Sequence, residues 1–500
     1  MLPLALTICG CAAKLAAPSL DPIAAATAHE VAAEWIYDLD GDGRPDCMEV
    51  DLDADGVVDR FRFDTDGDGT FELTTDRTSD AADDSVQALA LLVDGIPIGE
   101  IDAMWSQGYF REFFPPGAMV SPFPSMTYVS FSQMLGTSPP PGYEELYYDI
   151  ERNEIQGGVS QHLSAERDST AVKDDTFLGV LGYKQPATYS GLVYVLPNYT
   201  MRKDLKNVIR YLASTGASPA IAYVGTADGV AHKLGSRGTR ELLIELDRIL
   251  RELILRSQGR MRVLMASDHG NNFIRCQRIE LESGLETSGF QVSEVLTDSS
   301  SVVIPAFGLV GFAAAYLAPE RVTEFARAAV QIPGVDLAVY EEIGEARVLA
   351  TEGRGEARIA FAERPDRYRY EMIEGDPLEL RHLMAALARD GKSDADGFIR
   401  DEDWFEVTKD HTYPDAVRRV YEAAAGNVQN KATVLLSFDD STYYGRKLFD
   451  AVVDLAGTHG NLRNRSTLGF VLSNEKPPPD AVRSWDVRAA FSRVPMGPSR

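Results

Sequence analysis

Apolar runs of strand length that end in acidic or histidine residues constrain the fold of residues 85–500 more than any other feature. The runs VQALALLVDG, PAIAYVGTADG and RVLMASDHG alternate with longer amphipathic segments such as GTRELLIELDRILRELILRS. This alternation predicts an α/β protein with a mostly parallel central sheet and helices on both faces. Functional groups gather at the carboxyl ends of strands in such sheets, so the residues that end these runs are candidate site residues.

Three of these run ends carry potential metal ligands. Asp94 ends the first run, and Asp268 and His269 end the third. Asp228 and His232 follow the second run four residues apart, a spacing that puts both side chains on one face of a helical turn, suited to chelating one ion. Taken alone, an aspartate in the position of Asp94 is more often a helix cap or turn residue than a ligand, and Asp228 with His232 is equally explained as a salt-bridged pair.

Two further residues stand in similar contexts. Thr127, in FPSMT, lies where a proline-rich loop meets an expected helix start, so its hydroxyl would be near the positive helix end. A free hydroxyl is a poor nucleophile without a base or a metal, and Thr127 could instead be a simple N-cap. His459 stands between small residues in GTHGN. The chain has no G-x-S-x-G motif, so a Ser-His-Asp hydrolase is not indicated.

Taken in order, LVDG, FPSMT, ADGVAH, SDHG and GTHG resemble the motifs of the type I phosphodiesterase/nucleotide pyrophosphatase branch of the alkaline phosphatase superfamily. The resemblance implies an alkaline phosphatase-like fold and a hydrolase that acts on small-molecule phosphoesters through two zinc ions. Thr127 would be the nucleophile. By the same resemblance, Asp94, Thr127, Asp268 and His269 would hold one zinc ion, and Asp228, His232 and His459 the other.

One loop departs from the pattern of that family. The family has a histidine-glycine loop after the nucleophile helix and an asparagine that holds a phosphate oxygen, whereas this chain has GTSPPPGYEELYYD. Tyr143, Tyr147 or Tyr148 could take over that contact. The substrate class therefore stays open, and a phosphomonoesterase or a phosphoryl transferase is the enzyme alternative. The chain lacks a Cys-x-Pro-x-Arg motif, which disfavours the related sulfatases.

An acidic repeat with a period of 13 residues precedes the α/β region. Between residues 38 and 84 there are 17 Asp and Glu against 4 Arg, nearly half of the chain's net charge of -27. Alternate carboxylates around a glycine turn supply the oxygen ligands that Ca²⁺ prefers, so calcium binding is predicted here. The candidate ligands are Asp38, Asp40, Asp42 and Asp46 in the first repeat, Asp51, Asp53, Asp55 and Asp59 in the second, and Asp64, Asp66, Asp68 and Glu72 in the third.

The remaining features concern location and domain organisation. The start MLPLALTICGC resembles a bacterial lipoprotein signal with Cys11 as the lipidated residue, which predicts an exported chain tethered to a bilayer at the cell envelope. The negative charge argues against a nucleic-acid partner. A non-enzymatic alternative is an inactive, calcium-dependent surface protein. The expected segments are a signal (1–11), a linker (12–35), calcium repeats (36–84) and a catalytic domain (85–500) with an inserted cap at about 318–432.

Overall fold

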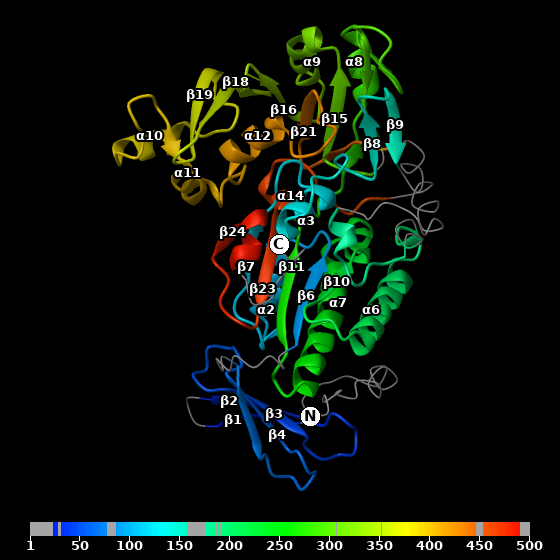
Figure 1. The fold of residues 1–500 in the computed structure, drawn as a ribbon, viewed down its shortest axis with the longest axis vertical. Coiled ribbons are helices and arrows are strands. Elements are labelled where there is room, and N and C mark those ends of the chain that lie inside the picture. The colour runs from blue at the N-terminus through cyan, green and yellow to red at the C-terminus, as the bar shows by residue number, and fades with distance from the viewer. Residues whose placement is uncertain are drawn as a thin grey trace.

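Three sheets follow one another along the long axis of the molecule in the computed structural model (Figure 1). The predicted signal 1–11 with Cys11, and most of the predicted linker 12–35, lie outside the described residues. No helix in the described part of the chain is both long enough and apolar enough to span a bilayer. The structure describes residues 24–28, 32–77, 87–157, 176–186, 189, 192–306, 308–351, 353–446 and 454–490.

The central sheet is mixed and has six strands in the order β10-β6-β11-β23-β7-β24. Only β23 runs against the others, because it pairs antiparallel with both β11 and β7. The parallel neighbours β10, β6 and β11 therefore end at one edge, as expected for the predicted α/β fold. The strands are β6 (Ala88–Val93), β7 (Gly117–Val120), β10 (Ala220–Val224), β11 (Arg262–Ser267), β23 (Leu468–Ser473) and β24 (Ala481–Arg483).

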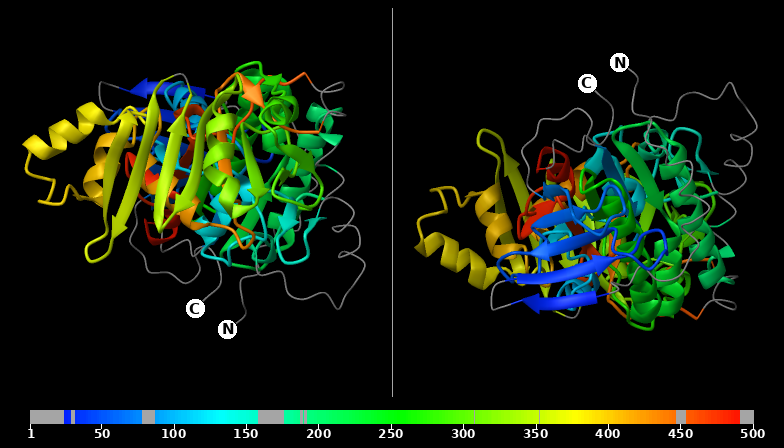
Figure 2. Two further views of the ribbon diagram at one scale, coloured as in Figure 1. Left: turned by 90° about the horizontal axis from the view of Figure 1, so that it is seen from above. Right: turned by 90° about the horizontal axis from the view of Figure 1, so that it is seen from below.

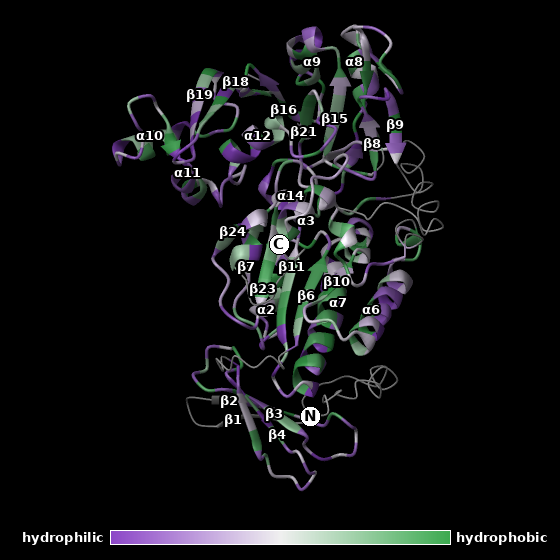
Figure 3. Cartoon of the chain, viewed as in Figure 1, coloured by the Kyte–Doolittle hydropathy of each residue, from purple (hydrophilic) through white to green (hydrophobic). Residues whose placement is uncertain are grey.

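Helices cover both faces of this sheet. Alternate residues of β6 point to opposite faces: Leu89 and Leu91 pack in one core cluster, whereas Ala90 and Leu92 pack in another. All six residues of β6 are buried, and Figure 3 shows the central strands as apolar. One face is covered by α2 (Ile98–Trp105), α6 (Pro197–Ser214) and α7 (Thr226–Arg256), the other by α3 (Thr127–Leu135), η2 (Phe177–Gly179) and α15 (Val487–Ala490).

A second, nine-stranded sheet lies across the carboxyl-terminal edge of the central one (Figures 1 and 2). Its strands come from residues 291–438, a wider range than the predicted insertion 318–432. The strands are β13 (Gln291–Ser293), β14 (Ser301–Val303), β15 (Phe312–Leu317), β16 (Val335–Glu342), β17 (Glu345–Ala350), β18 (Gly355–Ala362), β19 (Arg367–Gly375), β20 (Ile399–Arg400) and β21 (Val434–Phe438).

Helices also cover this second sheet on both faces. Residues of α8 and α9 share one core cluster with it, and residues of α10, α11 and α12 share another. The helices are α8 (Leu281–Thr287), η3 (Pro319–Arg321), α9 (Val322–Ala329), α10 (Arg381–Arg389), α11 (Asp401–Thr408) and α12 (Ala416–Ala425). Smaller elements are the pairs β8 (Leu146–Asp149) with β9 (Glu154–Gly157) and β12 (Gln277–Arg278) with β22 (Thr442–Tyr443), and the short helices α14 (Asn464–Thr467) and η4 (Ser484–Asp486).

The acidic repeats form loops of a five-stranded antiparallel sheet at the opposite end of the molecule (Figure 2). The segments CMEV and RFRF are strands, and each repeat loop joins two neighbouring strands. Glycines with positive φ, such as Gly43, Gly56 and Gly69, close the loops. The strands are β1 (Ala24–Ala28), β2 (Ala32–Tyr37), β3 (Cys47–Asp51), β4 (Arg60–Phe63) and β5 (Leu73–Asp76). Cys47 in β3 and Cys276 are not joined by a disulfide.

A buried polar network joins this N-terminal sheet to α7 and to the loop after α2, next to the central sheet. Tyr37 donates to Glu49 at 2.8 Å, and Arg111 lies 3.1 Å from the same carboxylate. Arg251 of α7 bridges Glu112 and another α7 residue, Asp247. Arg251 and Arg111 lower the pKa of Glu112 despite its burial. Because these charges are out of water, each depends on its partner, and together they fix the N-terminal sheet to α7.

Removal of Arg251 tests this network. We expect Arg251→Met to lower the free energy of unfolding by about 3 kcal/mol, because Glu112 would stay buried without its cation. Urea denaturation of the full chain measures the change. Arg237→Met is the control: its pair with Glu241 is exposed, so about 0.5 kcal/mol or less is expected. Equal losses in the two variants would contradict the role of the network.

Candidate metal centre

The carboxyl ends of β6 and β11 bring the first predicted ligand set together. Asp94 follows β6, and Asp268 and His269 follow β11, its parallel neighbour. His269 Nε2 lies 3.5 Å from Asp94 Oδ1 and 3.2 Å from Asp268 Oδ2. Thr127 Oγ1 completes the set, 3.2 Å from Asp94 Oδ1 and 3.3 Å from His269 Nε2. All four predicted members of this set therefore meet at one point.

The second predicted set lies directly beside the first. Asp228 and His232 are in the first two turns of α7, and His459 comes from a distant loop. Asp228 Oδ1 is 3.3 Å from His232 Nε2 and 3.5 Å from His459 Nε2. The ring of His459 stacks on that of His269 from the first set, with 3.9 Å between centroids. Two ions held by these sets would therefore be neighbours.

Backbone carbonyl groups fix the three histidine rings. Nδ1 of His232 contacts Gly457 O at 2.8 Å, Nδ1 of His269 contacts Gly270 O at 2.9 Å, and Nδ1 of His459 contacts Ser125 O at 3.0 Å. A carbonyl oxygen can only accept, so each Nδ1 must carry the proton. In the neutral ring this leaves the Nε2 lone pair free and aimed at the carboxylates, the arrangement typical of metal-binding histidines.

Burial has different effects on the titrating groups. It lowers the pKa of His269 to about 4 and that of His459 to about 3, so both rings are neutral near pH 7. It raises the pKa of Asp268 to about 7, and burial together with the charge of Asp268 raises the pKa of Asp94. Burial would raise the pKa of Asp228, but the pair with His232 holds it below the usual range and raises the pKa of His232.

Two carboxylate oxygens in this cluster favour bound cations. Asp228 Oδ1 and Asp268 Oδ2 are buried and accept no hydrogen bond. Burying a carboxylate oxygen without a hydrogen-bond donor costs free energy. A metal ion bound to each ligand set would give each of these two oxygens a partner. Mixed nitrogen and oxygen donors in two adjacent groups are a ligand set that suits zinc. The residues present therefore fit two metal ions.

Thr127 is placed as a nucleophile would be. It is the first residue of α3, after Met126 in an extended conformation, and the first regular helical bond runs from Ser130 N to Met126 O. The N–H groups of the first turn therefore have no partner within the helix, and they make that end positive. An anion bound in front of Thr127 would be stabilised by this helix end.

Sequence analysis missed Tyr223 and the carbonyl groups that orient the histidines. The Tyr223 hydroxyl, at the end of β10, donates to Asp94 Oδ2 and so fixes which oxygen of Asp94 faces the cluster. Alternation along β10 could have placed Tyr223 on the face of α3, but no motif marks it. Ser125, Gly270 and Gly457 act through main-chain atoms, which leave no sequence signature beyond the small side chains around them.

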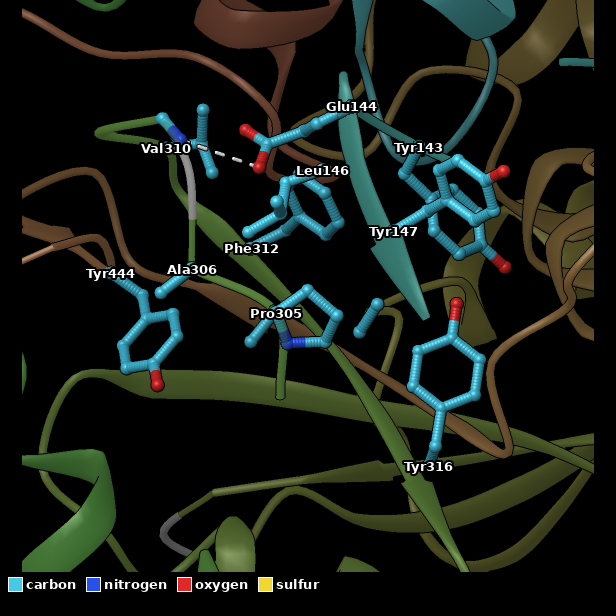
Figure 4. Close-up of a pocket in the computed structure, with 13 residues that line it drawn as sticks. Tyr143, Glu144, Leu146, Tyr147, Pro305, Ala306, Val310, Phe312, Tyr316 and Tyr444 are labelled. Atoms are coloured by element: carbon cyan, nitrogen blue, oxygen red, sulfur yellow. Dashed lines mark hydrogen bonds between the residues drawn. The ribbon is translucent and has the colours of Figure 1, made fainter. Parts of the chain in front are cut away.

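The three tyrosines suggested for the phosphate contact lie elsewhere. Tyr143 accepts a hydrogen bond from the Ala432 amide at 3.2 Å, and Tyr148 donates to Asn153. Tyr147 and Tyr143 line a hollow together with Tyr316 and Tyr444 (Figure 4), and no member of either ligand set lines it. Among the described residues, none of these three hydroxyls bonds to a member of either ligand set.

Comparison with known proteins gives only remote structural likenesses. No family model and no curated protein matches the chain. Murine ectonucleotide pyrophosphatase/phosphodiesterase 5 shares 12% identity at a TM-score of 0.45, covering 83% of this chain and 97% of its own. Phosphonoacetate hydrolase from Sinorhizobium meliloti, bound to phosphonoformate, shares 16% identity at a TM-score of 0.45, covering 82% of this chain and 95% of its own.

Gly95 tests the packing of the two ligand sets. A Cβ at Gly95 would lie 2.7 Å from Asp228 Oδ1, and its φ of +69° is strained for other residues. We therefore expect Gly95→Ala to fold but to retain less zinc than the parent protein, as measured by elemental analysis after gel filtration. Gly99→Ala is the control, because a Cβ there meets nothing within 4 Å. Full zinc retention in Gly95→Ala would contradict the assigned geometry.

Proposed function

We propose that the chain is a metal-dependent phosphoester hydrolase of the phosphodiesterase/nucleotide pyrophosphatase type. The observation that carries this proposal is the convergence of Thr127 with both ligand sets at the positive end of α3. The five motifs in family order support it. Asp94, Thr127, Asp268 and His269 would hold one zinc ion, and Asp228, His232 and His459 the other. The substrate class favoured is a small phosphodiester or a nucleotide-type pyrophosphate.

Zinc in such a site would lower the pKa of an attacking hydroxyl and offset the charge of the phosphoryl group. The chain's own residues supply the rest. Thr127 Oγ1 loses its proton to solvent and attacks phosphorus; the Oγ1–P bond forms, the bond to the leaving group breaks with its electron pair staying on that oxygen, and the leaving oxygen takes a proton from solvent. The N–H groups at the start of α3 face the phosphoryl oxygens. Water then attacks the same phosphorus and releases Thr127 with phosphate or its monoester.

The Thr127 variants test the nucleophile. We expect Thr127→Ala to lower kcat on a nitrophenyl phosphodiester by about 10³-fold or more, since the attacking atom is lost. Thr127→Ser keeps the hydroxyl and should retain measurable activity. The assay compares matched nitrophenyl diester and monoester substrates with zinc-loaded protein. A preference for the monoester would indicate a phosphomonoesterase instead of a phosphodiesterase. Undiminished hydrolysis by Thr127→Ala would overturn the proposed mechanism.

We further propose that the N-terminal loops bind calcium in an exported protein anchored through Cys11. In each loop several carboxylates converge within 4.8 Å, and the first loop contributes Asp38, Asp40 and Asp42. Main-chain amides also bond to these side chains: Gly41 and Gly43 donate to Asp38 at 2.6 and 2.8 Å. Such closely spaced negative charges repel one another until a cation neutralises them.

Calcium titration of the zinc-loaded protein tests these loops. We expect Asp40→Asn, Asp53→Asn and Asp66→Asn each to weaken one calcium site in calorimetry, because each removes one ligand charge. Asp76→Asn is the control, since Asp76 pairs with Arg60 outside the loops. Without calcium, trypsin should cleave faster at Arg44, while phosphodiesterase activity stays mostly intact. An absence of calcium binding by the parent protein would overturn the proposal.

A further inference from the structure

Arg419 is a buried arginine at the junction of the two large sheets. It belongs to α12, which packs on the second sheet, and its side chain is 1% exposed. No carboxylate of the described residues forms an ion pair with it. Burial lowers the pKa of its guanidinium to about 9, so it remains charged near pH 7. Burying such a charge is costly, and neutral acceptors must offset the cost.

Arg419 donates to five acceptors in three separate segments. Nη2 reaches Pro122 O at 3.3 Å, Ser125 Oγ at 3.1 Å and Thr467 Oγ1 at 2.9 Å. Nη1 reaches Pro414 O at 2.8 Å and Leu462 O at 3.1 Å. Four of these acceptors belong to the catalytic region, in the loop before α3 and in the segment after His459. The guanidinium group of Arg419 therefore holds the loop before α3 and the segment after His459 against α12 through hydrogen bonds.

These two segments hold the reacting groups. Ser125 precedes Thr127 by two residues, and its carbonyl oxygen accepts the Nδ1 proton of His459 at 3.0 Å. Its amide donates to Gly460 O at 3.2 Å, and its hydroxyl bonds to Asn461 O at 3.2 Å. A shift of Ser125 would therefore move Thr127 and rotate His459 together. Arg419 contacts Ser125 from the side of the second sheet.

We propose that Arg419 is a positioning residue for the phosphoryl-transfer site. It acts through Ser125 to set the place of Thr127 and the orientation of His459, and so makes the second sheet part of the catalytic machinery. The change in kcat expected from this inference rests on the function proposed above. Its consequence for metal retention at His459 is independent of any substrate.

The kinetic test replaces the guanidinium. We expect Arg419→Met to lower kcat on the nitrophenyl phosphodiester by about 10²-fold with KM changed less than about threefold, because binding survives while the nucleophile is displaced. Arg419→Lys keeps the charge but not the fork, so it should recover only part of kcat. In Arg419→Ala, millimolar guanidinium should restore part of kcat by filling the vacated volume.

Arg483 supplies the matched control for stability. It is also buried, and it pairs with Asp401 and Asp415 of the second-sheet helix layer without contacting Ser125 or the His459 segment. We expect Arg483→Met to be destabilised in thermal melts but to keep kcat at temperatures where it is folded. A folded Arg419→Met with unchanged kcat, or an equal loss of kcat in Arg483→Met, would overturn the proposal.

A metal-release measurement separates this inference from the proposed function. With zinc loaded and no substrate present, Arg419→Met should release one of two zinc ions to a chromogenic chelator at least tenfold faster than the parent protein and Arg483→Met. Faster release combined with a parent protein that cleaves no phosphoester would support the positioning role and reject the proposed function. Unchanged release would show that His459 keeps its orientation without Arg419, and so would overturn the inference.

Discussion

The crowding of three carboxylates, two of them buried, beside three histidines is the constraint on which the candidate metal centre depends. Asp94 and Asp268 lie in one ligand set, and Asp228 lies in the other, which is joined to the first by the stacked rings of His269 and His459. Such a group is unfavourable unless hydrogen bonds or cations compensate its charge, and two of its oxygens have no donor. The surrounding structure supplies the other partners: the Tyr223 hydroxyl, the Gly95 amide and the positive end of α3.

This constraint also explains the two-layer arrangement at the junction of the sheets. The ligands come from strand ends, from α7 and from the loop that carries His459, so no single element can hold them. The loop with His459 and the loop with Thr127 bond to each other through Ser125, and both are fixed from outside by Arg419. The second sheet thus contacts the site through Arg419 of α12, which packs on that sheet.

The sequence indicated the α/β region and the seven residues that the structure brings together in the two ligand sets, because these features are local, whereas Asp46 and Asp55 of the calcium prediction lie outside the converging carboxylate groups. Apolar strands ending in Asp94 or in Asp268 and His269 place those side chains at one sheet edge, whatever the loops do. The contribution of Arg419 could not be predicted, because two of its five acceptors, Pro122 and Ser125, lie 297 and 294 residues away, and three of the five are main-chain oxygens. The roles of the tyrosines in GYEELYYD could not be predicted either, because nothing in that segment indicated that Tyr143 would be buried against Phe312.

The way in which the histidine rings are held has a consequence for the order of assembly. Each ring is oriented by a carbonyl group of its own neighbourhood, so its direction is set by the backbone and not by an ion. The rings would therefore keep their direction in the absence of an ion, and a metal ion could bind without reorienting them. Metal ions proposed for this site would then exchange without a change in the histidine rings, and their identity would depend on metal supply as well as on the ligands.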